Sequence, residues 1–270
     1  MKIALVDLCG AKDFREHKSY VDSMAFLAEE GIDFEDYASG LTGLDAKIEG
    51  LNKALASDAD LVWVMRGGFI CIDTLDRIDW EKVVASGKKF YGLSDFTHFS
   101  TVAVPKGVTC YYGQGLSHIK EFFPTEPERK FIADFLKTGI PVCTSPEPLA
   151  CANAGLDIAK EKIIGGHLLI FTLMESQLEI DLKDRYLFLE YHTGTTGNNL
   201  EELGYYFDQL LYVLKKNLPK GFVLGHTSIK GEDGSFIPVE VINDFCSKKL
   251  SALDLPAYYL DHYKNTVTLR

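Results

Sequence analysis

Residues 61–69 read LVWVMRGGF, and residues 89–97 read KFYGLSDFT. In both stretches a short apolar run ends in a turn that contains glycine, a pattern typical of strands buried in a parallel sheet. Residues 2–6 (KIALV) form a third run of this kind. Residues 44–58 place leucine or isoleucine at intervals of three or four, which predicts one apolar face of a helix. This alternation of strands and helices predicts a parallel sheet with helices on its faces.

The remainder of the chain divides into a proline-rich middle and a second alternating part. Five of the nine prolines fall within residues 116–160, which we interpret as a connector between domains, with a long surface excursion of one domain as the alternative. Farther on, the spacing of apolar residues predicts an amphipathic helix over 198–215. The predicted class is therefore α/β, with a first domain over 1–115 and a second over 161–270.

The composition is that of an ordinary globular protein, with 46% apolar and 25% charged residues. Asp and Glu number 39 against 28 Lys and Arg, so the net charge of -11 argues against nucleic acid and anionic membranes as partners. The six cysteines include no C-x-x-C pair, which predicts reduced thiols and no zinc site. No secretory or membrane-spanning run is visible, so we expect a cytoplasmic protein.

The ends of two predicted strands carry the residues that indicate catalysis. Ligands bind outside the carboxyl ends of strands in open parallel sheets. Gly67 and Gly68 follow one strand, and their backbone N–H groups can approach a ligand closely. Ser94 follows the other, and a serine on a sharp strand-to-helix turn exposes its hydroxyl group and presents the next N–H as an oxyanion donor. The alternative is that Ser94 only caps a helix.

A serine nucleophile needs a base and an orienting carboxylate. Glu190 closes the apolar run 186–189, where a carboxylate is costly without a partner; we therefore predict it as the acid, the alternative being a strand-end residue bonded to backbone N–H groups. The polar loop 192–199 follows it, either touching substrate or only connecting two elements. Spacing alone does not choose among the seven histidines.

These motifs resemble the LD-carboxypeptidase family of serine peptidases, which includes murein tetrapeptide carboxypeptidases and microcin C immunity peptidases. RGGF at 66–69 is similar to the family's R-G-G-Y-G, and GLSDFT at 92–97 to its G-[YFN]-S-D-x-T, with the serine about 28 positions after the arginine in both. Four later segments are similar to further family motifs in the same order: 164–168 (IGGHL), 187–190 (LFLE), 206–211 (YFDQLL) and 221–225 (GFVLG). The resemblance spans roughly residues 60–270.

The resemblance implies a catalytic triad of Ser94 as nucleophile, Glu190 as acid and His262 as base. His226 is the alternative base, but its surroundings are similar to a strand motif of the family, whereas those of His262 are similar to the histidine motif. The implied oxyanion donors are the backbone N–H groups of Gly67 or Gly68 and of Asp95.

The resemblance also implies a fold and a substrate. The first domain would be a flavodoxin-like or amidotransferase-like parallel sheet, the second a smaller mixed α/β domain, and the active site would lie in the cleft between them. The implied reaction releases the terminal D-alanine of a murein tetrapeptide, a muropeptide, by hydrolysis of an L,D-peptide bond. This reaction needs no metal and no cofactor. A homodimer is one possible oligomeric state.

Three further residues are candidates for substrate binding: Arg66, Thr193 and Asn198. For Arg66, a structural ion pair is the alternative. The chain departs from the family motifs at four positions: Ile70, His167 and Asp261 stand in place of glycine, asparagine and glycine, and Gln209 in place of arginine. A microcin-type or acyl-amino-acid amide hydrolase, and a non-catalytic binding protein with the same fold, are therefore kept as alternatives.

Overall fold

The computed structural model describes residues 1–270 except 14, 16, 39–41, 153–154, 193–199 and 232–233. The chain forms two compact units, one comprising Met1–Val142 with Tyr263–Arg270 and the other Cys143–His262. The segment 116–160, which we expected to be a connector, is thus divided between the two units. The last residues of the chain, expected in the second domain, belong to the first unit.

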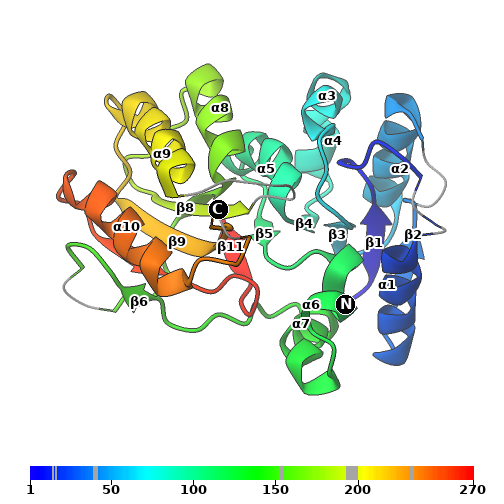
Figure 1. Cartoon of the computed structure of the whole chain (residues 1–270). Helices are drawn as coiled ribbons and strands as arrows, with labels where there is room; N and C mark the ends of the chain where they lie inside the picture. Colours follow the sequence, from blue (N-terminus) through cyan, green and yellow to red (C-terminus); the bar gives the residue numbers. More distant parts are fainter. Residues whose placement is uncertain (14, 16, 39–41, 153–154, 193–199, 232–233) are drawn as a thin grey trace. The chain divides into compact units, whose positions relative to one another are not determined.

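The first unit is built on a six-stranded sheet with the strand order β11-β5-β4-β3-β1-β2 (Figure 1). Its strands are β1 (Ile3–Val6), β2 (Phe34–Asp36), β3 (Leu61–Val64), β4 (Lys89–Gly92), β5 (Cys110–Tyr112) and β11 (Val267–Leu269). Strands β1 to β5 are parallel, and β11 pairs with β5 in the antiparallel direction. The order 2-1-3-4-5 of the parallel strands is that of flavodoxin-like sheets, which confirms the predicted class.

Helices cover both faces of this sheet. They are α1 (Lys18–Glu29), α2 (Leu44–Ala56), α3 (Cys71–Thr74), α4 (Trp80–Ala85), α5 (Thr97–Ala103), α6 (Ile119–Phe122) and α7 (Glu126–Thr138). On one face Trp63 of β3 belongs to a buried cluster with Phe26 of α1 and Phe135 of α7. On the other, the Phe90 ring of β4 lies 4.6 Å from the Phe99 ring of α5. Burial on both faces explains why these strands are continuous apolar runs.

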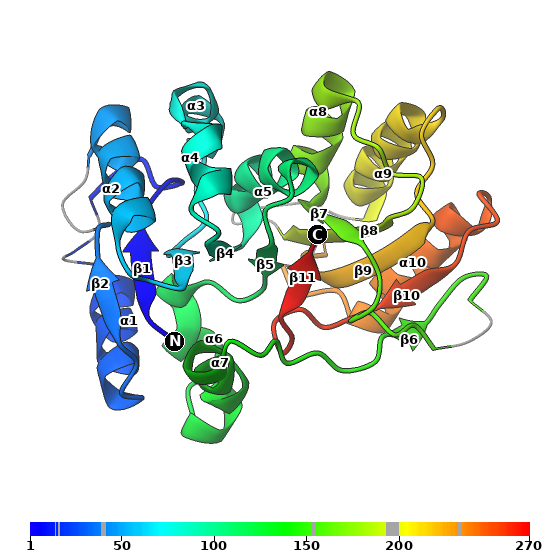
Figure 2. The ribbon, with the colours of Figure 1, turned by 180° about the vertical axis from the view of Figure 1, so that it is seen from behind.

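The second unit has a five-stranded sheet with the order β6-β10-β9-β8-β7 (Figure 2). Its elements are β6 (Glu147–Pro148), β7 (Ile163–His167), α8 (Leu168–Leu178), β8 (Tyr186–His192), α9 (Leu200–Leu214), β9 (Gly221–Ser228), α10 (Val239–Ser251) and β10 (Ala257–Tyr259). Strands β7 to β10 are parallel neighbours in chain order, so right-handed crossovers place α8, α9 and α10 on one face. Within the described ranges, no helix has the length and apolar character needed to cross a bilayer.

A β-bulge interrupts the pairing of β8 with β9. Leu189 pairs with Leu224, whereas Tyr191 pairs with Thr227, so two residues of β9 oppose the single residue Glu190. These two residues are 225 and 226, a glycine and a histidine. Because a bulge takes backbone groups out of the regular ladder and redirects them, the N–H of residue 226 becomes available to a side chain beside Glu190.

Candidate active site

Ser94 lies in a strained turn between β4 and α5. Its φ angle is 55°, in the left-handed region that costs a residue other than glycine about 1–2 kcal/mol. The Ser94 N–H donates to Tyr112 Oη at 2.6 Å, and the Ser94 carbonyl accepts from Thr97 Oγ1 at 2.6 Å. No side chain caps the 3-10 turn Ser94–Phe96 or helix α5, so the alternative of Ser94 as a helix cap does not hold. The turn instead presents Ser94 at the carboxyl end of a parallel strand.

The double glycine after β3 faces this serine. A Cβ atom added to Gly67 would lie 3.0 Å from Ser94 Cβ and 3.3 Å from Ser94 Oγ. A Cβ atom added to Gly68 would lie 1.8 Å from the carbonyl oxygen of Cys9, so Gly68 is required by close packing of two backbone segments. In the described part of the chain, nothing accepts a hydrogen bond from the N–H of either glycine. Both groups are therefore free to bind a ligand oxygen.

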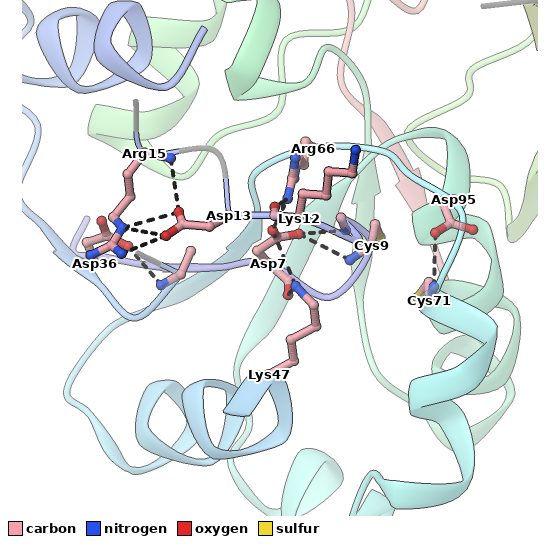
Figure 3. Close-up of polar contacts among 12 residues, drawn as sticks. Asp7, Cys9, Lys12, Asp13, Arg15, Asp36, Lys47, Arg66, Cys71 and Asp95 are labelled. Carbon is pink, nitrogen blue, oxygen red and sulfur yellow. Dashed lines mark hydrogen bonds and ion pairs between the residues drawn. The ribbon is translucent and has the colours of Figure 1, made fainter. Parts of the chain in front are cut away.

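The side chain of Asp95 joins the serine turn to the glycine loop. Its buried carboxylate accepts from the backbone N–H of Cys71 at 3.0 Å and lies 2.9 Å from His98 Nδ1. Figure 3 shows this contact at the start of α3, which follows the glycine loop directly. The Asp95 side chain thus links the serine turn to the segment that follows the glycine loop, the two parts of the predicted oxyanion hole. The predicted oxyanion donor is a different group of the same residue, its backbone N–H.

Arg66 forms an ion pair with a buried carboxylate, Asp7 (Figure 3). Arg66 Nε and Nη2 donate to Asp7 Oδ2 at 3.0 and 2.6 Å. Lys47 Nζ lies 3.4 Å from the same oxygen, and the backbone N–H groups of Cys9 and Gly10 donate to Oδ1. The structural ion pair weighed for Arg66 is therefore present, and its contact with substrate stays a prediction. The cluster lies between β1 and β3, at the switch point where flavodoxin-like sheets bind ligands.

In the second unit, Glu190 is buried near the carboxyl end of β8 and pairs with an imidazole. Its Oε2 lies 2.9 Å from His192 Nδ1. Burial by itself raises the pKa of Glu190, but the charge and hydrogen bond of His192, with the charges of His167 and His262, outweigh burial and hold this pKa well below its usual range. The Glu190 charge in turn raises the pKa of His192. Glu190 is therefore an ionised carboxylate with an imidazole partner.

His262 is fully buried and contacts the bulged residues of β9. Its Nδ1 accepts the backbone N–H of His226 at 3.1 Å, so its neutral ring carries the proton on Nε2. A Cβ atom added to Gly225 would lie 2.8 Å from His262 Nδ1 and 3.0 Å from Glu190 Cβ. Burial lowers the pKa of His262 to about 4, which keeps the ring neutral at pH 7. Two predicted triad residues thus flank one glycine.

Replacing Gly225 by alanine is expected to destabilise the second unit by about 1–3 kcal/mol, the usual cost of overpacking. The new methyl group would lie 2.8 Å from both His262 Nδ1 and Phe188 Cζ. Thermal unfolding followed by circular dichroism measures the effect. Gly155→Ala is the control, because a Cβ there meets none of the described residues within 4 Å, and it should change stability by less than about 1 kcal/mol. Equal stability of the two variants would contradict the described packing of His262.

Comparison with known families agrees with these motifs. Residues 3–113 match the LD-carboxypeptidase N-terminal domain family. This part of the first unit is therefore similar to the N-terminal domain of LD-carboxypeptidases. The resemblance inferred from the sequence motifs is confirmed, and the low identities given next fit a divergent member.

Solved structures share the LD-carboxypeptidase fold over nearly the whole chain. Muramoyltetrapeptide carboxypeptidase from Oxalobacter formigenes is 22% identical, with a TM-score of 0.76 over 100% of this chain and 92% of its own. The MccF-like protein from Bacillus anthracis is 18% identical, with a TM-score of 0.71 over 99% and 96%. Microcin C7 self-immunity protein MccF, in complex with aspartyl sulfamoyl adenosine, is 15% identical, with a TM-score of 0.76 over 99% and 90%. Comparison with curated protein sequences found no match.

The structure accommodates one departure from the LD-carboxypeptidase motifs directly. Ile70 replaces a glycine of the family motif, and its φ of -122° is one that any residue adopts. The predicted substrate ligands Thr193 and Asn198 lie outside the described residues. His167, which replaces an asparagine, is buried at the end of β7 beside His192, with ring centroids 5.7 Å apart.

Four residues that bond to predicted site residues or to their partners were given no role of their own from the sequence: Asp7, Lys47, Tyr112 and His192, the last considered only as the first residue of the loop 192–199. Asp7 follows a buried apolar run, as Glu190 does. The argument that a carboxylate at such a position needs a partner could therefore have identified Asp7 as well. Lys47 lies in a helix that is otherwise amphipathic, and nothing local shows that its ammonium group is buried. The Tyr112 hydroxyl group accepts a hydrogen bond from the Ser94 N–H, and His192 pairs with Glu190. No local sequence pattern indicates either contact.

Proposed function

We propose that this chain is a serine peptidase that releases the terminal D-alanine of a murein tetrapeptide. The observation that carries the proposal is the left-handed backbone of Ser94, with φ of 55° in a strand-to-helix turn. Backbone strain of this kind persists where the surrounding structure fixes it, and it clusters at active sites. A nucleophilic serine needs such a sharp turn to expose its hydroxyl group.

The proposed reaction passes through an acyl-enzyme. Ser94 Oγ attacks the scissile carbonyl carbon while His262 accepts the hydroxyl proton. The backbone N–H groups of Gly67 or Gly68 and of Asp95 hold the oxyanion that develops. His262 then donates the proton to the leaving amino group of D-alanine, and water hydrolyses the ester in a second cycle of the same transfers.

The states of the two histidines near Glu190 favour His262 as the base. With a pKa of about 4 it is neutral at pH 7, whereas the Glu190 charge raises the pKa of His192. A general base must be unprotonated before it acts. Because Nδ1 accepts the His226 N–H and Nε2 carries the proton, the mechanism further requires that the neutral ring first exchange its Nε2 proton for one on Nδ1. This exchange breaks the hydrogen bond from the His226 N–H and leaves Nε2 free to accept the proton of Ser94.

The experiment that tests the proposal combines a substrate with a covalent probe. Wild-type protein and Ser94→Ala are each incubated with a murein tetrapeptide ending in D-alanine and analysed by mass spectrometry. We expect the wild type to remove one alanine and the variant to leave the peptide intact. A fluorophosphonate should label the wild type at Ser94 and leave the variant unmodified.

A second substrate in the same assay distinguishes the alternatives. An aminoacyl-nucleotide amide is included because the MccF structure, which has the same fold, holds aspartyl sulfamoyl adenosine. Cleavage of this amide with an intact tetrapeptide would retain the serine hydrolase and replace the substrate. If neither substrate is cleaved and Ser94 is not labelled, the chain is a binding protein and the proposal is wrong.

A further inference from the structure

Three side chains that can bind a metal ion converge near the carboxyl ends of β7 and β8. They are His167, Glu190 and His192, whose ligand atoms all lie within 4.8 Å of one another. His167 pairs in register with Glu190 on the neighbouring parallel strand. His192 lies two residues beyond Glu190 on the same strand, and alternation along a strand puts residues two apart on one face. The pairing of β7 with β8 therefore fixes this cluster.

The geometry of the cluster is close to that of a metal site. The Glu190 Oε2 and His192 Nδ1 atoms are 2.9 Å apart, and the imidazoles of His167 and His192 are nearly perpendicular, at 85°. Ligand atoms around a tetrahedral Zn²⁺ with bonds of about 2.0–2.1 Å lie roughly 3.3 Å apart. Closing the widest separation, at most 4.8 Å, to this value needs only a small movement of side chains.

The chemistry of the three donors is that of zinc sites with an open position. Two imidazoles and one carboxylate hold Zn²⁺ in several hydrolytic enzymes, with water as the fourth ligand. Glu190 is 1% exposed and His167 9%, so these two donors are held by packing. Hard cations such as Mg²⁺ prefer a set of oxygen ligands, which this cluster does not offer.

The cysteine pattern predicted no zinc site, and the structure gives a reason to revise that expectation. The prediction examined only thiols and short spacings, whereas these donors are 23 and 2 residues apart in the chain. One of them, His167, stands where the resembling motif has asparagine, so the second imidazole is a feature of this chain.

We propose that His167, Glu190 and His192 bind a divalent transition metal ion, with Zn²⁺ as the representative of the class. The inference does not rest on the proposed peptidase activity, because binding needs no substrate and no nucleophile. Since Glu190 is also the proposed triad acid, a bound ion and the triad would compete for the same carboxylate.

The test is a titration of the full-length chain, freed of metal by a chelator, with Zn²⁺ in an isothermal calorimeter. The chain carries Cys143→Ser and Cys151→Ser, because the other four cysteines are buried and these two thiols would bind zinc independently. We expect one ion per chain. His167→Asn and His192→Gln should each weaken binding at least about tenfold, the lower end of what losing even an outer-shell partner of a metal ligand causes.

Two controls and a second readout make the result decisive. Ser94→Ala should bind Zn²⁺ like the parent, which separates this inference from the proposed function. His17→Asn removes an exposed imidazole and keeps a side chain that caps α1, so it should also bind normally. Zn²⁺ should raise the melting temperature of the parent and of both controls by mass action, and should raise that of the two ligand variants less. The inference is overturned if the parent binds no zinc, or if His167→Asn and His192→Gln bind it as the parent does.

Discussion

Alanine in place of Ser94 is expected to lower kcat/KM for the tetrapeptide by at least about 10³-fold. The hydroxyl group supplies the nucleophile, and no neighbouring side chain of the turn can replace it: Asp95 is buried in its bonds to Cys71 and His98. The folded structure should not suffer, because Ser94 Oγ caps no helix. Stopped assays with mass-spectrometric detection of free alanine measure the rates.

The same residues should behave as one unit when they are combined. His262→Ala and Glu190→Gln are each expected to lower kcat/KM by about 10³- to 10⁴-fold, and the double variant Ser94→Ala/His262→Ala should be no slower than Ser94→Ala alone. Once the nucleophile is gone, its base has nothing to activate. Additive losses would mean that His262 acts independently of Ser94, for example by maintaining the fold.

His226 provides the matched control for His262. Its backbone N–H donates to His262 Nδ1, and glutamine at this position keeps that group, so His226→Gln should retain activity within about tenfold. A reversed result, with His226→Gln inactive and His262→Ala active, would show that the sequence motifs had been aligned to the wrong histidine. Labelling of all variants with the fluorophosphonate would report whether Ser94 is still activated.

The elements that the sequence predicts well are those whose burial leaves a local pattern. Strands β1, β3 and β4 are buried on both faces and are therefore continuous apolar runs, and α2 and α9 each have one apolar face. Strand β2 is missed because its three residues are only partly buried and two of them are acidic. The pairing of β11 with β5 joins residues more than 150 positions apart, and no local pattern encodes it.

The candidate site divides in the same way. Ser94, the double glycine and Glu190 are visible as polar or glycine residues at the ends of apolar runs. The turn of Ser94 is held by a hydrogen bond that its N–H donates to Tyr112 and by one that its carbonyl accepts from Thr97. The position of His262 depends on a bulge in the pairing of β8 with β9. Such contacts arise only when strands pair, so sequence reasoning can nominate the residues but not their hydrogen bonds.

Replacing Asp7 by alanine is expected to destabilise the first unit by about 3–5 kcal/mol, as breaking a buried ion pair usually does. Asp7 and Lys47 have side chains only 2% and 1% exposed. Without the carboxylate, the Lys47 ammonium group would keep, among the described residues, the carbonyl oxygen of residue 7, 2.9 Å away. Arg66 is 18% exposed and can reach water, so most of the cost should come from the lysine.

Urea unfolding followed by tryptophan fluorescence measures this effect in one unit, because both tryptophans, Trp63 and Trp80, lie in the first unit. The control is Asp45→Ala in the same helix as Lys47. Its carboxylate is 95% exposed, and exposed pairs contribute about 0–1 kcal/mol.

The double variant Asp7→Ala/Lys47→Met decides whether the cost comes from an unpaired buried charge. Methionine keeps an unbranched side chain of similar length and removes the ammonium group, so the double variant should recover much of the stability lost in Asp7→Ala. If it does not recover, the loss arises from the bonds that Asp7 makes to Arg66 and to the N–H groups of Cys9 and Gly10. Those bonds hold the loop that leads into Gly67, so in that case peptidase activity should fall together with stability in both variants.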